Sequence, residues 1–329
     1  MTVADSPAPI DVVFVLLPGS LVLDWAGPAE ALRSANAQLA AQGLPARFRL
    51  RFVGLQTQAT SSVGAVVAGL EPLPATLPAP CWLVLVGQPG ATIDLDTPEA
   101  RAALHWLRGL RPRKDRLELL CVCAGTLLAA NAGLLAGRRA TTHHHHLDEL
   151  RAAEPACEVV ANRVFVDDAP VWSSAGVTCG VDLTLHRIAQ VCGPALAAAV
   201  AQALVVGWRR GPQDSEFSPF LAHRAHLHAA LHRVQDAIAQ APRADWSQTA
   251  LARVAHTSPR HLARLFAEHA GVSPQDYLRS IRLGLARRAL SAGHTVSQAA
   301  ELAGFSSDAQ LRRAWRASGL PGAPSQAGS

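Results

Sequence analysis

Two cysteines, Cys121 and Cys123, stand in an apolar run, LLCVCAGTLLAANAGLL, that begins at Leu119 and changes character at Gly125. The first part has the composition of a buried strand and the second that of a helix. A side chain at such a bend lies at the helix N-terminus, where the helix dipole and free N–H groups favour a thiolate. We therefore expect Cys121 in the core and Cys123 at the bend, as a nucleophile, a sensor of a ligand or simply a buried side chain.

A run of four histidines, 143–146, and the glycine loop GQPG are further candidates. Successive side chains point in different directions, so four neighbouring histidines rarely hold one ion without outside ligands. We expect His143 to face a pocket, the other three to lie on the following helix or at its surface, and no metal or cofactor to bind. Gly87, in the glycine loop, offers its N–H to a carboxylate or an oxyanion, or serves only as a tight turn.

The strands and helices that position these groups are predicted from alternating patterns over the first 200 residues. Apolar runs predict strands at 10–17, 48–55, 81–87 and 116–123, and helical patterns predict helices at 26–43, 97–111 and 125–135, with one or two closing helices at 180–206. This alternation is typical of an α/β fold with a doubly wound, mostly parallel sheet that is covered on both faces. Thr97, followed by Pro98, has the types that begin a helix.

The charge is distributed unevenly along the chain. Residues 1–220 hold 17 basic and 19 acidic side chains, a net charge of −2, whereas residues 221–329 hold 13 arginines and 6 acidic side chains, a net charge of +7. Strand patterns end at 207–220, GWRRGPQDSEFSPF, which has no apolar period and indicates a linker. We predict a first domain at 1–206, a linker at 207–224 and an all-α domain at 225–329. A basic domain of this kind suggests a polyanionic partner.

Two segments of the basic domain share one layout, a short helix, a tight turn and a second helix with an apolar stripe. They begin at Gln248 and Val296, and their stripes are Leu262, Leu265 and Phe266, and Leu311, Ala314 and Trp315. Ser258, Ser273 and Thr295 are predicted N-caps, Thr295 with Gln298 as a capping box, and Gly304 supplies a turn. Once the stripes are buried, the side chains left outside are Arg260, Arg264, Asp308, Gln310, Arg312 and Arg313. This layout predicts paired helix-turn-helix units that enter the DNA major groove.

These segments, TSPRHLARLFAEHAGVSPQDYLRSIRLGLARRAL and VSQAAELAGFSSDAQLRRAWR, resemble the DNA-binding domain of the AraC-type regulators over 225–316. The resemblance implies that the arginines and Gln310 face bases or phosphates, and that Asp308 lies at a groove-facing place where it accepts a bond from cytosine but repels phosphate. The chain ends in GLPGAPSQAGS and lacks the aromatic and arginine that usually close this domain. We therefore expect a frayed end and weaker DNA binding.

The first domain is similar to the PfpI-like domain of the class I glutamine-amidotransferase superfamily over 10–200, through CAG, AGLLAGRRATTH and SAGVTCGVDLTLH. By this resemblance Cys123 is the cysteine of the strand-to-helix turn, Asp24 (ahead of Pro28) its acid and His143 the histidine near the thiol. The order of the motifs resembles the GlxA-like subfamily of AraC-type regulators.

Two hypotheses follow. In the first, the chain is a sequence-specific DNA-binding transcriptional regulator that binds double-stranded DNA, forms a homodimer and senses a small molecule; the resemblance implies a nitrogen-containing metabolite. In the second, it is a cysteine-dependent hydrolase or glyoxalase-like enzyme, which a thiol, an acid and a histidine permit. We favour the first, with no catalytic residues, because Ala124 follows the thiol and no oriented third group is evident. Six cysteines are too few for a disulfide scaffold, and VVFVLL is too short to span a membrane, so we expect a cytoplasmic protein with no membrane partner.

Overall fold

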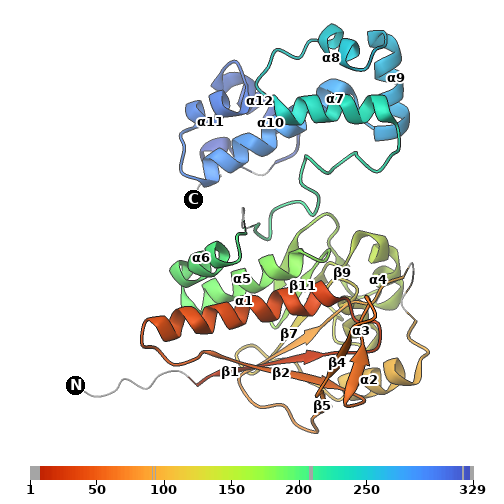
Figure 1. Cartoon of the computed structure of the whole chain (residues 1–329), viewed down its shortest axis with the longest axis vertical. Coiled ribbons are helices and arrows are strands. Elements are labelled where there is room, and N and C mark those ends of the chain that lie inside the picture. The colour runs from red at the N-terminus through yellow and green to blue at the C-terminus, as the bar shows by residue number, and fades with distance from the viewer. Residues whose placement is uncertain (1–7, 91, 93, 207–209, 321, 327–329) are drawn as a thin grey trace. The chain divides into compact units, whose positions relative to one another are not determined.

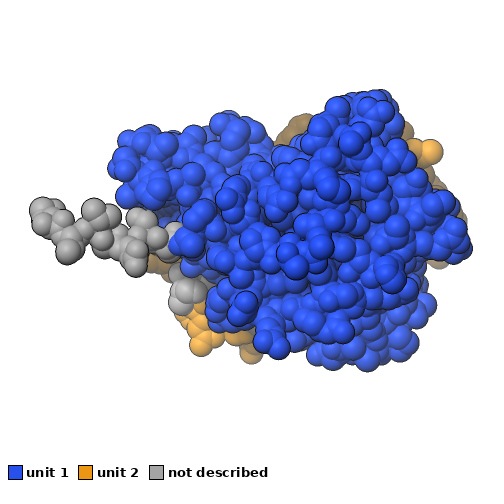
Figure 2. Space-filling model, turned by 90° about the horizontal axis from the view of Figure 1, so that it is seen from below, with its two compact units in different colours: residues 1–216 blue, residues 217–329 orange. Residues whose placement is uncertain are grey.

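The computed structural model describes residues 8–90, 92, 94–206, 210–320 and 322–326. The chain divides into two compact units, residues 1–216 (unit 1) and residues 217–329 (unit 2) (Figures 1 and 2). The predicted linker, 207–224, is divided between the two units, and its residues 207–209 lie outside the described residues.

Unit 1 is built on one large sheet with the strand order β10-β11-β7-β6-β1-β2-β5. Its strands are β1 (Ile10–Val15), β2 (Phe48–Gly54), β5 (Glu71–Pro72), β6 (Cys81–Leu85), β7 (Leu117–Val122), β10 (Phe165–Asp168) and β11 (Val171–Ser174). All neighbouring strands in it run parallel except β10 and β11. Two small sheets pair β3 (Gln58–Thr60) with β4 (Val66–Ala68) and β8 (Arg139–Ala140) with β9 (Glu158–Val159).

Every residue of the central strands β1 and β6 is buried, which shows that both faces of this sheet are covered. The helices are α1 (Val22–Ala41), α2 (Pro98–Arg108), α3 (Gly125–Asn131), α4 (Leu147–Ala153), α5 (Cys179–Cys192) and α6 (Pro194–Ala203), with a 3₁₀ turn η1 at His144–His146. Helices α1, α5 and α6 lie side by side (Figure 1). Thr97 caps α2 as predicted, since its Oγ1 accepts the N–H of Ala100 at 3.1 Å.

The strand order β2-β1-β6-β7-β11 is that of a doubly wound sheet. From β1 the chain adds β2 on one side and then returns to add β6 on the other, so the switch point lies between β1 and β6. Ligands of such sheets bind at this point, outside the carboxyl ends of the strands. Val15 pairs with Leu85, and Leu85 pairs with Cys121, so that β1, β6 and β7 end at nearly the same level. The loops that carry Asp24, Gly87 and Cys123 therefore start together at one edge of the sheet.

A buried arginine ties α5 to the sheet. The guanidinium carbon of Arg187 lies 3.8 Å from the ring centre of Trp172 and 4.8 Å from that of Trp82. Its Nη2 forms an ion pair with Glu118, and both side chains are less than 10 % exposed. The charge is thus compensated by one carboxylate and by two aromatic faces.

Unit 2 is all-α. Its helices are α7 (Ala229–Gln240), α8 (Gln248–Val254), α9 (Pro259–Ala270), α10 (Pro274–Ser291), α11 (Val296–Ala303) and α12 (Asp308–Ala317), with a 3₁₀ turn η2 at Pro324–Gln326. Helix α10 serves two hydrophobic cores: its first half, with Tyr277 and Ile281, packs with α7, α8 and α9, and its second half, with Ala286 and Leu290, packs with α11 and α12. The predicted fold class, an α/β sheet followed by an all-α domain with two helix-turn-helix units, is confirmed.

The predicted helix starts in unit 2 are confirmed as well. Ser258, Ser273 and Thr295 each accept a backbone N–H three residues ahead, and Thr295 with Gln298 forms a complete capping box. Gly304 turns the chain between α11 and α12 at a φ of 82°, in the left-handed region that glycine adopts without strain. In the first helix-turn-helix segment, the turn between α8 and α9 contains His256, at a φ of 55°.

The expected frayed end is wrong. Ser318 donates its N–H to Ala314 and its hydroxyl to the carbonyl of Trp315 at 2.8 Å, which closes α12. Leu320 packs against the second core, Pro324 is buried, and η2 contacts α10 and α12. The end of the domain is thus packed against the second core through Leu320 and Pro324.

Candidate functional site

Cys123 lies at a sharp elbow between β7 and α3, as predicted. Its φ of 57° is in the left-handed region, which a side chain other than glycine rarely occupies. Its N–H donates to the carbonyl of Ser174 at 3.1 Å. A Cβ at Gly125 would lie 2.2 Å from the carbonyl oxygen of Leu85, so only glycine lets the start of α3 approach β6 this closely. The elbow is held by the sheet on both sides.

Asp24 and Gly87 meet beside this elbow. Asp24, in the first turn of α1, is fully buried, and its Oδ2 accepts the N–H of Gly87 at 3.0 Å. A Cβ at Gly87 would lie 2.9 Å from both Asp24 Oδ2 and the backbone nitrogen of Ala124, so glycine is required here too. The predicted role of Gly87, an N–H offered to a carboxylate, is thus taken by a carboxylate of the chain itself. The other oxygen, Asp24 Oδ1, is buried and has no hydrogen-bond partner among the described residues.

Burial controls the protonation of this pair. It raises the pKa of Asp24 from an ordinary 3.8 to about 7, against the smaller effects of the Gly87 N–H and the nearby Cys123 thiol. Burial, followed by the negative charge of Asp24, raises the pKa of Cys123 far above its ordinary value. Loss of hydration at a site 3 % exposed thus opposes the thiolate that the dipole of the seven-residue helix α3 favours.

His143 directly follows Thr142, whose side chain is hydrogen-bonded to the elbow. Thr142 donates its hydroxyl to the carbonyl of Cys123 at 2.9 Å, and a Cβ at Gly176 would lie 3.6 Å from His143 Cδ2. Burial and the adjacent histidines lower the pKa of His143 to about 4, so its ring is neutral at pH 7. Within the described residues, no hydrogen bond joins this ring to the Cys123 thiol.

The histidine run forms a compact cluster. One ring nitrogen each of His143, His144 and His145 lies within 4.8 Å of the others. Zinc ligands at about 2.1 Å in a tetrahedron lie about 3.4 Å apart, so the rings must move closer before they hold such an ion. His144 Nδ1 already contacts a carboxylate, and His146 is buried with its Nδ1 2.8 Å from Glu149 Oε2. The cluster is thus mainly engaged in contacts within the chain.

Sequence reasoning missed Glu216. It belongs to the stretch interpreted as a linker, yet its side chain is only 7 % exposed, and its Oε1 lies 2.9 Å from His144 Nδ1. The same carboxylate would lie 3.7 Å from a Cβ at Gly176, and its charge contributes to the raised pKa of Cys123. The local composition, SEFSPF, holds no signal for this burial. Glu216 therefore forms part of the wall around the elbow.

The second candidate surface lies on α9 and α12. The apolar stripes of both helices are buried as predicted. The four arginines named from the sequence, Arg260, Arg264, Arg312 and Arg313, are exposed. None of them forms an ion pair with the described residues, although Arg264 Nη2 contacts His261 Nδ1 at 2.9 Å.

Asp308 and Gln310 differ from these arginines. Both are partly buried: Asp308 Oδ2 accepts the hydroxyl of Ser297 at 2.8 Å, and Gln310 Oε1 accepts the N–H of Ser306 at 2.7 Å. These contacts hold the start of α12 against α11. Arg313 and Gln310, with Arg279 and Arg282 from α10, also line a groove of about 390 Å³.

Comparison with known proteins identifies both units. Residues 12–190 match the DJ-1/PfpI family, and residues 251–318 match a helix-turn-helix domain. The chain is 30% identical over 309 residues to the HTH-type transcriptional regulator GlxA of Rhizobium meliloti, covering 92% of this chain and 91% of that protein. The chain belongs to the GlxA-like subfamily of AraC-type transcriptional regulators. This regulator is also 29% identical over 325 residues to the HTH-type transcriptional regulator CdhR of Pseudomonas aeruginosa, covering 93% and 88% of the two chains.

A solved structure is similar in fold. A THiJ/PfpI family protein from Pseudomonas syringae superposes with a TM-score of 0.50 at 22% identity, covering 71% of this chain and 87% of that one. The helix-turn-helix match, the PfpI match and the curated relatives together show a DNA-binding transcriptional regulator with a PfpI-like sensing domain. No described helix combines the length and the apolar run that crossing a bilayer requires.

Proposed function

We propose that the regulator senses a small, nitrogen-containing molecule at the elbow site, formed by Asp24, Gly87, Cys123 and His143. The observation that carries this proposal is the fully buried Asp24 carboxyl, whose Oδ1 meets no hydrogen-bond partner of good geometry among the described residues and has only the weak thiol donor of Cys123 nearby. Leaving such an atom unsatisfied costs about 1–3 kcal/mol, and a bound N–H donor removes that cost. Because the pKa of Asp24 is about 7, an amine also finds a carboxyl group that ionises readily when the cation arrives.

Sensing accounts for the elbow better than catalysis does. A nucleophilic cysteine needs a lowered pKa or a hydrogen-bonded base. Here the pKa of Cys123 is raised, by burial and by the charge of Asp24, the acidic group beside it. No hydrogen bond from His143 reaches the thiol within the described part of the chain. The enzyme alternative predicts that Cys123→Ser abolishes turnover of an amide or glyoxal substrate while DNA binding persists. Absence of turnover in the unaltered protein rejects that alternative.

For DNA, we propose that α9 and α12 enter successive major grooves. Helix α10 has 18 residues and is about 27 Å long, comparable to the ~34 Å between successive grooves on one face of a duplex. The exposed Arg260, Arg264, Arg312 and Arg313 then face bases or phosphates, where Arg binds guanine through two hydrogen bonds. Asp308 and Gln310, which we predicted to face the groove, are proposed to act mainly by holding the start of α12.

The test of DNA recognition is to measure binding of the full chain to duplexes from upstream of its own gene at several salt concentrations. Arg264→Ala and Arg313→Ala are each expected to weaken binding by about 1–3 kcal/mol, or roughly 5- to 150-fold, if they contact bases. A phosphate contact instead lowers the salt slope by about one. Arg101→Ala, an exposed arginine on α2, is the matched control. Unchanged affinity and slope in both variants contradict the proposal.

The test of sensing is a thermal-shift screen of nitrogen-containing metabolites against the full chain. A ligand at about 100 times its Kd stabilises the protein by about 2.7 kcal/mol. A true effector is expected to shift the unaltered protein and to lose that shift in Asp24→Asn. Equal shifts in both would place the ligand elsewhere. Homodimer formation, proposed from the family resemblance, is tested by sedimentation of the same samples.

A further inference from the structure

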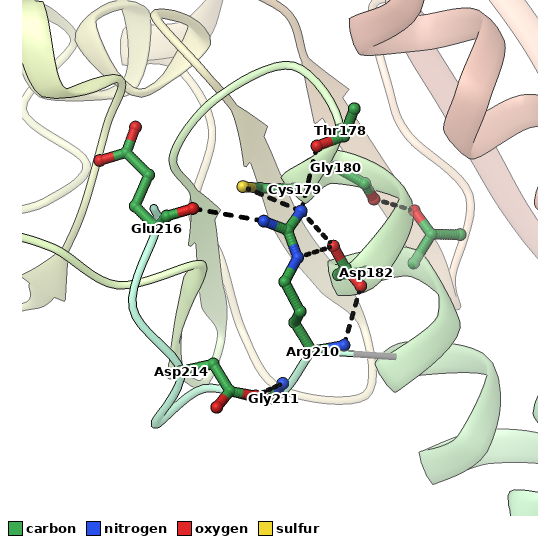
Figure 3. A network of polar contacts seen from close by, with 9 residues as sticks. Thr178, Cys179, Gly180, Asp182, Arg210, Gly211, Asp214 and Glu216 are labelled. Carbon is green, nitrogen blue, oxygen red and sulfur yellow. Dashed lines mark hydrogen bonds and ion pairs between the residues drawn. The ribbon is translucent and has the colours of Figure 1, made fainter. Parts of the chain in front are cut away.

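A short segment between the two units is fastened to unit 1 beside the elbow site. We call residues 210–216 the strap. It follows residues 207–209 and ends where unit 2 begins. Figure 3 shows its polar contacts, which gather around the first turn of α5. Nothing in the composition of this segment predicted such contacts.

The strap has one strong anchor at its start. Arg210 donates its N–H to Asp182 Oδ1 at 3.0 Å, and its Nε and Nη2 donate to Oδ2 at 2.9 and 2.6 Å (Figure 3). Nη2 also donates to Thr178 Oγ1 at 3.0 Å. Asp182 is 5 % exposed, so the carboxylate depends on this cation for compensation. Multiple hydrogen bonds between charged groups are among the strongest contacts that side chains form.

Further contacts hold the rest of the strap. The N–H of Gly211 donates to Asp214 Oδ2 at 2.8 Å, which closes a tight turn, and the carbonyl of Asp214 accepts the N–H of Val164 at 3.0 Å. Arg210 Nη1 donates to the carbonyl of Glu216 at 3.3 Å. The guanidinium therefore connects both ends of the strap, and Arg210 helps to hold the backbone of Glu216 in place.

The elbow site is closed to solvent in this state. Asp24 and Cys123 are 0 % and 3 % exposed, so a molecule that reaches Asp24 must displace part of the wall. The other parts of the wall are bonded into the sheet: the elbow through Ser174, and the loop before α1 through the Leu21 N–H to the carbonyl of Gly87 at 2.9 Å. Glu216 instead comes from the strap, and its carboxylate is held by the ring of His144 at 2.9 Å. Glu216 lies in neither a strand nor a helix, so it can leave the wall without breaking the hydrogen bonds of the sheet.

Movement of Glu216 also moves the start of unit 2. Pro219 packs within unit 2, because a Cβ at Gly284 on α10 would lie 2.9 Å from its Cγ. Only Phe217 and Ser218 separate the last anchored residue of the strap from Pro219. So short a connection spans about 10 Å from Glu216 to Pro219 even when extended. The strap thus links the elbow site covalently, with little slack, to the helix that supports both DNA-reading helices.

We propose that Glu216 is a ligand-contacting residue of the sensing site and that the strap transmits occupancy to unit 2. With the site empty, Glu216 binds His144 and the strap stays docked on Asp182. An entering amine takes Glu216 away from His144, the strap leaves α5, and unit 2 gains freedom to rearrange on DNA. This inference rests on the proposed sensing function and adds to it the route by which the effector acts.

The test uses the full chain without any effector. Arg210→Gln and Glu216→Gln are expected to release the strap, and Arg151→Gln, at a surface ion pair with Asp148, is the matched control. Alkylation of Cys123 by iodoacetamide at pH 8, followed by peptide mass spectrometry, reports opening. We expect the rate to rise at least about tenfold in both strap variants, since labelling follows the population of the open state.

Two further measurements keep the test decisive. Cys121, fully buried in β7, must stay unlabelled; if it reacts in step with Cys123, the variants have unfolded unit 1 and the strap is merely structural. Binding to the upstream duplex is expected to change at least about threefold in the same variants, as an effector would change it. Unchanged labelling of Cys123, or faster labelling with unchanged DNA binding, overturns the proposal. Loss of the DNA function itself is reported separately, by the Arg264 and Arg313 variants.

Discussion

Replacement of Asp24 by asparagine is expected to change how the stability of the regulator depends on pH. Burial raises the pKa of this carboxyl to about 7 in the folded chain, against 3.8 when it is unperturbed. The folded state therefore binds more protons than the unfolded state between about pH 4 and pH 7. Stability then falls as the pH rises through this window, because ionising Asp24 costs more in the fold than in water.

The size of the effect follows from the two pKa values. At about 1.4 kcal/mol per pKa unit, the destabilisation from Asp24 is about 1.7 kcal/mol at pH 5 and about 4.3 kcal/mol at pH 8, an increase of about 2.6 kcal/mol. Asparagine keeps an oxygen for the Gly87 N–H and does not ionise. For a unit of this size the variant should gain about 5–10 °C in Tm relative to the unaltered protein between pH 5 and pH 8.

Differential scanning fluorimetry of the full chain at pH 5, 6, 7 and 8 measures this difference. His143, whose lowered pKa makes stability rise with pH below about 6.5, is present in both proteins and cancels. Asp148→Asn removes an exposed carboxylate and is the control. A Tm difference between Asp24→Asn and the unaltered chain that is constant across the series refutes the reasoning, since Asp24 would then ionise alike in both states.

Two other predictions concern the framework. Gly304→Ala places a Cβ at a φ of 82° and 2.8 Å from Arg243 Cα, and should destabilise unit 2 by about 2–3 kcal/mol in urea unfolding. Gly293→Ala, with a φ of 87° and no atom within 4 Å of the added Cβ, should destabilise it by only about 1 kcal/mol. Equal destabilisation by the two variants would show that the close contact is unimportant. Arg187→Leu should destabilise unit 1 by about 3–5 kcal/mol because Glu118 loses its compensating charge, and adding Glu118→Leu should recover more than half of this loss. A double variant no more stable than the single one would contradict that account.

Local patterns predicted the elements correctly. The serine and threonine caps of unit 2, the apolar stripes of α9 and α12 and the elbow at Cys123 all depend on residues within one or two turns of one another. Helix capping and amphipathic burial are decided at this range, so the sequence alone indicates them. The mostly parallel, doubly wound sheet was also accessible, because alternation of strand and helix is typical of such sheets.

Burial and side-chain contacts in the folded chain decided the protonation and the partners of the site residues. The ionisation of Cys123 and Asp24 depends on how deeply the fold buries them, and burial opposes the thiolate that a helix start favours. Asp308 and Gln310 were predicted to face a groove, but partners on α11 and in the preceding turn engage them.

By itself, the sequence determined the α/β and all-α fold classes and the paired helix-turn-helix units, because periodicity and capping depend on neighbouring residues. Asp24 and His143 were indicated only by the family resemblance. Only the tertiary structure decided that Gly87 binds Asp24, that burial opposes ionisation of Cys123, and that Arg210 and Glu216 fasten a supposed linker to α5 and His144. Those outcomes depend on hydration lost and on partners tens of residues away, which no local pattern records.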